Sequence, residues 1–158
     1  MSRCLALSTL LLPFALGGCG SKGSVGLSAQ VQSASLAVES VTLGTKLSGS
    51  FELFLEVGPE ASGGSDVGLL SFALVTASSQ ATLVAPLHLS PAESQYHVPK
   101  GEQRILPFEL DHPDPLASAL LDALCAEPVQ ISGAVTDSLS GGESTPVHSQ
   151  SIAVRGCP

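Results

Sequence analysis

The segment 50–57, SFELFLEV, alternates apolar and polar residues in a way that limits the folds open to this chain. Its first, third, fifth and seventh residues are Ser, Glu, Phe and Glu, and the residues between them are Phe, Leu, Leu and Val. Successive side chains of a strand point to opposite faces, so one face of this segment is apolar and the other mostly polar. The pattern predicts a half-buried β-strand.

Shorter segments repeat the period of two along the rest of the chain. Strands are expected at 38–43, 69–76, 83–89, 95–99, 103–110, 129–135 and 149–154, with turn-rich connections at 59–68 and 136–146. Pro107 has no N–H to donate, which favours a sheet edge for the segment around it. About seven strands at this spacing predict a mainly β protein, an immunoglobulin-like antiparallel β-sandwich.

One segment, 114–127, changes to a helical period. Apolar residues recur at intervals of three and four, namely Leu116, Ala119, Leu120, Ala123 and Leu124. Asp114 is the expected N-cap, Pro115 the first helical residue, and Pro128 follows the expected end. The segment predicts one short amphipathic helix.

Residues 1–18 have the three parts of a secretory signal peptide. Arg3 supplies the positive charge, Leu5–Leu16 form an apolar run, and Gly17 and Gly18 are small residues before a cleavage site. Twelve residues are too few to cross about 30 Å of hydrocarbon as a helix. We therefore expect a leader that is removed and not a membrane-spanning helix.

The residues at the end of this leader, LGGC (16–19), resemble the lipobox of bacterial lipoproteins. The resemblance implies that the Cys19 thiol is acylated with chains such as palmitate, that cleavage makes Cys19 the first residue, and that the protein is membrane-attached. In that family Gly20 implies the outer membrane. Residues 19–29 would form a lipidated flexible tether and residues 30–158 the sandwich domain. The alternative is an ordinary secretory leader, with Cys19 paired to another cysteine.

Charge and cysteine content narrow the possible partners. The chain has 14 acidic and 6 basic residues, and loss of Arg3 with the leader changes the formal charge from −8 to −9. This charge argues against binding to nucleic acid or to anionic lipid head groups. Cys4 lies in the leader, and lipid would occupy Cys19. The remaining pair, Cys125 and Cys157, predicts one disulfide in an oxidising compartment.

The order of these elements gives a second resemblance. An alternating acidic strand, then GEQRILPFEL (101–110), a short helix and VQISG (129–133) are similar to the group-2 late-embryogenesis-abundant (water-stress and hypersensitive-response) β-sandwich. The similarity spans residues 36–156. That family carries Asn-Pro after its first long strand, where this chain has Gly58-Pro59.

No residue pattern indicates catalysis. The four histidines lack the His-x-x-x-His or His-x-His spacing of a metal site: His88, His97, His112 and His148. The DHPDP segment, 111–115, is interpreted as a turn and helix start, and neither Gly-x-Ser-x-Gly nor a phosphate-binding loop is present. We expect no enzyme, no metal and no cofactor.

The sequence therefore predicts a lipid-anchored envelope protein facing the periplasm or the cell surface. Its body would be a non-catalytic interaction or binding module for a protein or an apolar ligand, with no nucleic acid among its partners. The alternative is a membrane-anchored hydrolase whose site is not visible in the sequence.

Overall fold

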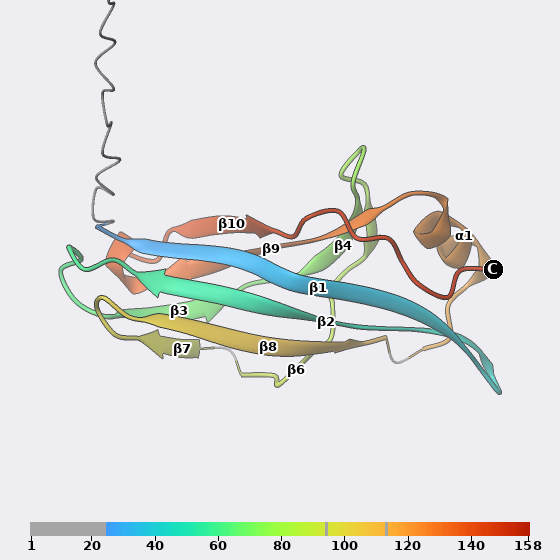
Figure 1. Cartoon of the computed structure of the whole chain (residues 1–158), viewed down its shortest axis with the longest axis horizontal. Helices are drawn as coiled ribbons and strands as arrows, with labels where there is room; N and C mark the ends of the chain where they lie inside the picture. The colour runs from blue at the N-terminus through green and yellow to red at the C-terminus, as the bar shows by residue number, and fades with distance from the viewer. Residues whose placement is uncertain (1–24, 94, 113) are drawn as a thin grey trace, which may run out of the picture.

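Ten strands and one α-helix form in residues 25–93, 95–112 and 114–158, the part of the chain that the computed structural model describes (Figure 1). The leader at 1–18, Cys19 and the tether up to residue 24 lie outside the described residues. The strands are β1 (Leu27–Val41), β2 (Gly44–Val57), β3 (Ser65–Leu69), β4 (Ala73–Thr76), β5 (Thr82–Val84), β6 (Leu89–Ser90), β7 (Gln95–Val98), β8 (Gln103–Asp111), β9 (Val129–Asp137) and β10 (Ser144–His148).

The first sheet is built on the long β1–β2 hairpin. Its strand order is β1-β2-β8-β6, and all its pairings are antiparallel. The alternation predicted for 50–57 is confirmed, since its four inward side chains are at most 1% exposed: Phe51, Leu53, Leu55 and Val57. The segment expected as a strand at 38–43 belongs to the hairpin, as the end of β1 and the turn that follows it.

The second sheet is organised around β9, which pairs on both sides. β10 lies along one edge of β9, whereas β3 and β4 lie one after the other along its opposite edge. β7 and β5 then pair with the outer sides of β3 and β4. The structure has ten strands where about seven were expected, partly because some expected strands are interrupted. The predicted antiparallel sandwich with one helix is confirmed.

The core lies between the sheets and contains a row of aromatic side chains. The ring centroid of Phe51 is 5.6 Å from that of Phe72 and 5.3 Å from that of Phe108, whose ring meets Tyr96 edge-on at 6.2 Å. Such tilted and edge-to-face contacts stabilise beyond the burial of apolar area alone. Aliphatic residues from both sheets complete this core.

Several strands begin or end at other residues than the sequence predicts. β3 begins at Ser65, within the segment expected as a turn, and the chain leaves the ladder between β3 and β4, so Leu70 is 45% exposed. The expected strand at 83–89 divides into β5 in one sheet and β6 in the other. β1 begins at Leu27, which places 27–29 in the sandwich and not in the predicted tether.

The expected edge position of Pro107 is confirmed. Pro107 pairs with Glu52 of β2 on one side of β8. On the other side of β8, the described residues contribute only β6, which pairs with Leu110 and Glu109. Pro107 thus lies on a stretch of β8 that has a neighbouring strand on one side only.

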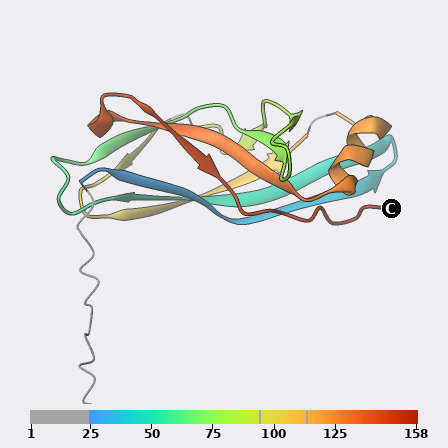
Figure 2. The same ribbon diagram turned by 90° about the horizontal axis from the view of Figure 1, so that it is seen from above.

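Residues 149–154 do not form the expected strand, so that prediction is wrong. The path of these residues shows how the two sheets are joined. The last strand is instead β10, which begins within the expected turn segment and ends at His148. Ser149 ends the regular ladder because its hydroxyl, at 2.9 Å, accepts the Ile131 N–H, while its own N–H donates to the Ile131 carbonyl. The chain then pairs with β9 once more, at Ile152, and crosses to β1 (Figure 2).

Residues 149–157, here called the closing segment, join the two sheets along one side. Ile152 exchanges two backbone hydrogen bonds with Val129 of β9, at 2.8 and 2.9 Å. Arg155 accepts from the Val38 N–H at 2.8 Å and donates to the Leu36 carbonyl at 3.0 Å. The closing segment therefore hydrogen-bonds to one sheet at Ile152 and to the other at Arg155.

The helix α1 (Ser118–Ala126) starts later than expected. Ala117 occupies its N-cap position without a side-chain hydrogen bond, so the prediction that Asp114 caps the helix is wrong. The Leu116 N–H donates to the Thr45 carbonyl at 2.7 Å, which ties the segment before the helix to the β1–β2 hairpin. The helix ends before Pro128, as predicted.

Tyr96 generates a prediction about stability, because its buried hydroxyl has no hydrogen-bond partner among the described residues. Burial, with repulsion from the Glu93 carboxylate, raises the pKa of Tyr96 above its usual value of 10.0, and the Arg104 guanidinium opposes the shift. A raised pKa means that the folded state binds the phenol proton more tightly than the unfolded state. Folding stability from this group is therefore complete below about pH 10 and is lost as the pH rises further.

We expect Tyr96→Phe to keep or raise the free energy of unfolding at pH 7, by up to about 1 kcal/mol, because it removes an unpaired buried hydroxyl. The variant should also lose less stability than the natural chain above about pH 10. Denaturant unfolding at pH 7 and across pH 9–11 measures both effects. A loss of more than about 1 kcal/mol at pH 7 would show that the hydroxyl has a stabilising partner.

Candidate functional site

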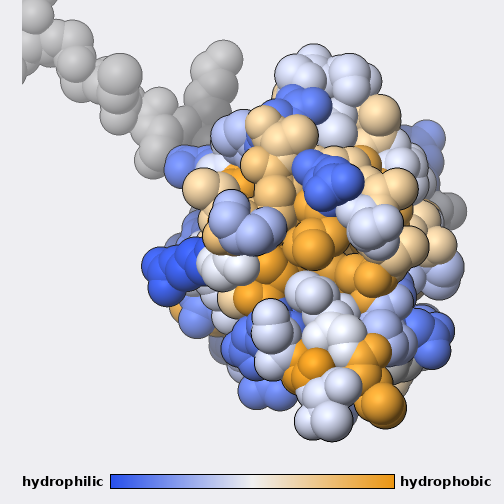
Figure 3. Space-filling model, turned by 90° about the vertical axis from the view of Figure 1, so that its right-hand side faces the viewer, coloured by the Kyte–Doolittle hydropathy of each residue, from blue (hydrophilic) through white to orange (hydrophobic). Residues whose placement is uncertain are grey.

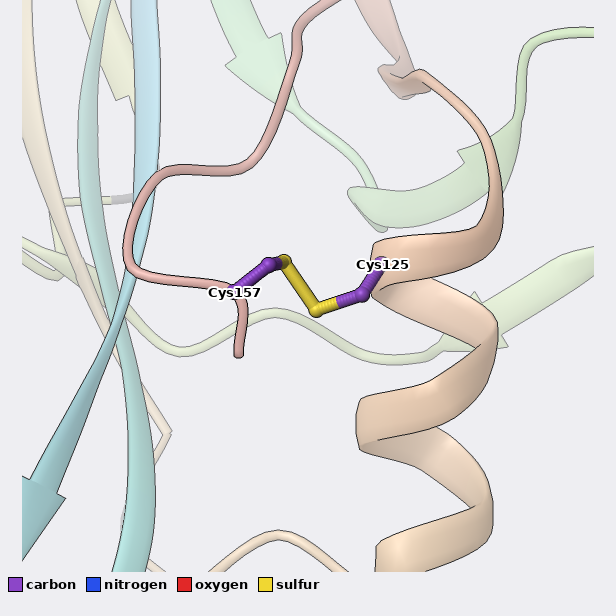
Figure 4. The surroundings of a disulfide bond; sticks show 2 residues. All are labelled: Cys125 and Cys157. Atoms are coloured by element: carbon purple, nitrogen blue, oxygen red, sulfur yellow. A yellow bond between two sulfur atoms is a disulfide. The ribbon is translucent and has the colours of Figure 1, made fainter.

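The predicted disulfide between Cys125 and Cys157 is present and connects α1 to the closing segment (Figure 4). The two Cα atoms are 5.7 Å apart, and the bond closes a loop with a sequence separation of 32. A loop of this length corresponds to about 3–4 kcal/mol of stabilisation in the chain-entropy model. The disulfide thus holds the helix against the segment that joins the sheets.

The DHPDP segment places its ionisable groups in separate contacts. Asp111, the last residue of β8, forms an exposed ion pair with Lys46 at 2.8 Å. The Nδ1 atom of His112 lies 2.8 Å from the Asp114 carbonyl oxygen, to which it can donate. The imidazole is therefore oriented by a backbone carbonyl, as expected for a turn.

A histidine–carboxylate pair that sequence reasoning missed lies elsewhere, between β3 and β7. Asp66 of β3 and His97 of β7 are directly opposite in the strand register, and their Oδ1 and Nδ1 atoms are 2.8 Å apart. The sequence could have indicated this pair only through the pairing of β3 with β7, two strands that are far apart in the chain. Both side chains are more than half exposed, at 64% and 61%.

The neighbouring serine does not complete a catalytic group with this pair. Ser65 precedes Asp66 on β3, so its side chain points to the opposite face of the strand. Its buried hydroxyl donates to the Asp137 carboxylate, which also accepts the Leu139 N–H. Ser65 and Asp137 therefore act together in the core and at the start of a short 3₁₀ helix, while His97 faces solvent.

Metal ligation has no candidate group in the described part of the chain, where no three His, Cys, Asp or Glu residues are close enough to hold an ion.

A lateral cleft of about 490 Å³ lies between β1 and the closing segment. Its lining comes from 30–34 and 149–152 and consists of amide, hydroxyl and aliphatic side chains. Within the described residues, no helix has the length and hydrophobicity needed to cross a bilayer.

An exposed apolar surface lies at the end of the sandwich that carries α1 and the tip of the β1–β2 hairpin. Apolar side chains gather at the centre of this end (Figure 3). We call it the apolar end and define it by six residues: Val41, Leu43, Pro115, Leu116, Leu120 and Leu121. Val41 and Leu43 are 44% and 85% exposed, and the three leucines from 116 to 121 are partly buried against the core.

The hairpin tip and the segment before α1 form one continuous part of this surface. A Cβ atom built on Gly44 would lie 3.2 Å from Cβ of Pro115. The Leu116–Thr45 backbone hydrogen bond holds the same two segments together. The base of the hairpin tip, at Gly44 and Thr45, therefore adjoins the segment before α1, at Pro115 and Leu116.

Exposed carboxylates lie on the elements that form the apolar end. Four carboxylates are exposed on its elements: Glu39, Asp111, Asp114 and Asp122. Lys46, the basic residue of the hairpin, is paired with Asp111, and Arg155 is the basic residue of the closing segment. We call the four carboxylates together the acidic rim of the apolar end.

Comparison with known proteins gives no relative from which a site could be transferred. No family model, no curated protein and no solved structure matches this chain. The interpretation of the apolar end therefore rests on the geometry and chemistry of the chain itself.

Proposed function

We propose that this chain is a lipid-anchored protein of the bacterial cell envelope and that its β-sandwich is a non-catalytic interaction module. The observation that supports this most is the position of the two ends of the sandwich. β1 begins at one end, and α1 with the apolar end lies at the other (Figure 1). An anchor that precedes β1 would leave the apolar end free to meet a partner.

The dimensions of the chain fit this arrangement. β1 has 15 residues, which at about 3.3 Å per residue gives a length of about 50 Å. Cys19 is eight residues before Leu27, a distance that an extended chain covers in at most about 28 Å. An acylated Cys19 would therefore keep the start of β1 within about 28 Å of the membrane surface, and the length of β1 would let the apolar end lie about 50 Å farther out.

Acylation would supply enough binding energy for a stable anchor. Each buried methylene of an acyl chain contributes about 0.8 kcal/mol, and two or more chains hold a protein firmly where one chain is marginal. The acidic body adds no attraction to anionic head groups. We infer that the attachment depends on the lipid at Cys19 and, from Gly20, that the outer membrane is its location.

The proposal also keeps the resemblance of residues 36–156 to the group-2 late-embryogenesis-abundant sandwich as a hypothesis. The lateral cleft is lined mainly by polar side chains, whereas exposed apolar side chains lie at the open surface of the apolar end. This arrangement favours a protein partner over an enclosed apolar ligand.

Substitution of the anchor residue tests the attachment. We expect Cys19→Ser to abolish incorporation of labelled palmitate and to stop the protein from partitioning with the membrane after carbonate washing, because the acceptor thiol is gone. Cys4→Ser is the matched control and should be acylated normally. Acylated, membrane-bound Cys19→Ser protein would contradict the proposal.

Substitution of the two histidine–acid segments tests the absence of catalysis. We expect the natural chain to show no hydrolysis of p-nitrophenyl acetate beyond that of an equal concentration of free imidazole, and Asp111→Asn/His112→Gln and Asp66→Asn/His97→Gln to behave alike. Because His112 is half-buried and the other three side chains are exposed, each pair of substitutions should change stability by no more than about 1 kcal/mol. Turnover that one of the folded variants loses would support the hydrolase alternative.

A further inference from the structure

We propose that the apolar end docks a protein whose contact surface has an apolar centre and basic residues at its edge. This inference deepens the proposed function, on which it rests, by naming the kind of partner that the module binds. It depends on three observations, which are an exposed apolar tip, a fixed geometry and an acidic rim.

The hairpin tip carries apolar side chains that do little for the fold. Leu43 is 85% exposed in the turn between β1 and β2, at a position where polar residues and glycine are usual. Val41, the last residue of β1, is also exposed. Together with the leucines of the α1 segment, they extend the apolar end beyond the core, as is typical of protein interaction sites.

The apolar end is held in one shape before any partner arrives. The Leu116–Thr45 hydrogen bond fixes the hairpin against the segment before α1. The Cys125–Cys157 disulfide fixes the other end of α1 to the closing segment, which hydrogen-bonds to both sheets. Docking therefore orders few groups, so little of the binding free energy is lost to conformational entropy.

The charges select among possible occupants. Exposed carboxylates at Glu39, Asp114 and Asp122 repel an anionic bilayer surface. They also disfavour a second copy of this chain bound end to end, because like charges would face each other. Basic residues at the edge of a protein partner would instead pair with these carboxylates while its apolar centre covers Leu43.

The position of the surface agrees with this choice. The apolar end is at the opposite end of the sandwich from the start of β1 (Figure 1). A partner could therefore approach from the side away from the proposed anchor without contacting the membrane.

Photo-crosslinking in intact cells tests the proposal with the full chain. The photoreactive residue benzoylphenylalanine replaces Leu43 in one variant and Ile105 in the other. Ile105, on the β8 surface, is the matched control because it is also an exposed apolar residue, at 55%. We expect a discrete adduct with another protein at position 43 and none at position 105.

Charge reversal, combined with benzoylphenylalanine at position 43, tests whether the contact surface of the partner is basic. Asp114→Lys/Asp122→Lys should reduce the yield of the adduct at least about tenfold, because basic groups would then face basic groups. Glu60→Lys/Glu102→Lys changes the net charge equally in exposed loops near the start of β1 and should leave the yield unchanged. Mass spectrometry of the adduct should place Lys or Arg residues around the crosslinked site of the partner.

Several outcomes would overturn the proposal. These are no adduct at position 43, an adduct with lipid, an adduct with a second copy of this chain, and a yield that the Asp114/Asp122 reversal leaves unchanged. Acylation of Cys19 is measured separately. A lost adduct in a chain that is still acylated therefore rejects the docking surface alone, while an adduct in a chain that is not acylated rejects the anchor alone.

Discussion

The hydrogen bonds of Arg155 to Leu36 and Val38 are the contacts on which the shape of this sandwich depends most. They attach the closing segment to β1, and the pair formed by Ile152 and Val129 attaches the same segment to the other sheet. Gly156 makes this approach possible, because a Cβ atom at that position would lie only 2.2 Å from the Val38 carbonyl oxygen. Cys157 then extends the connection to α1 through the disulfide.

This connection relates the fold to the proposed function. The closing segment joins the sheets along one side and also positions α1. The leucines within α1 and just before it form much of the apolar end. The hairpin tip completes that surface through the Leu116–Thr45 hydrogen bond. An anchored protein that binds a partner at its far end needs a rigid body between the two, and a long β1–β2 hairpin locked at its side provides one.

Sequence reasoning predicted what depends on local pattern and could not predict what depends on long-range pairing. The alternation at 50–57 and the cysteine arithmetic led to the sandwich and to the Cys125–Cys157 bond, both of which are confirmed. Asp114 failed as a helix cap because the hydrogen bond from Leu116 to the distant Thr45 delays the helix. The strand expected at 149–154 failed because the Ser149 hydroxyl replaces a backbone acceptor. The apolar end combines residues about seventy positions apart, and no motif marks such a surface.

The most direct test of the closing segment compares Gly156→Ala with Gly141→Ala by denaturant unfolding. Both glycines have a positive φ, of 76° and 75°, so alanine strains the backbone by about 1–2 kcal/mol at each, but only at Gly156 does its Cβ meet another atom. We expect Gly156→Ala to lose about 2 kcal/mol more than Gly141→Ala, because the new methyl group forces apart the two hydrogen bonds of Arg155. Equal losses of stability in the two variants would contradict the account.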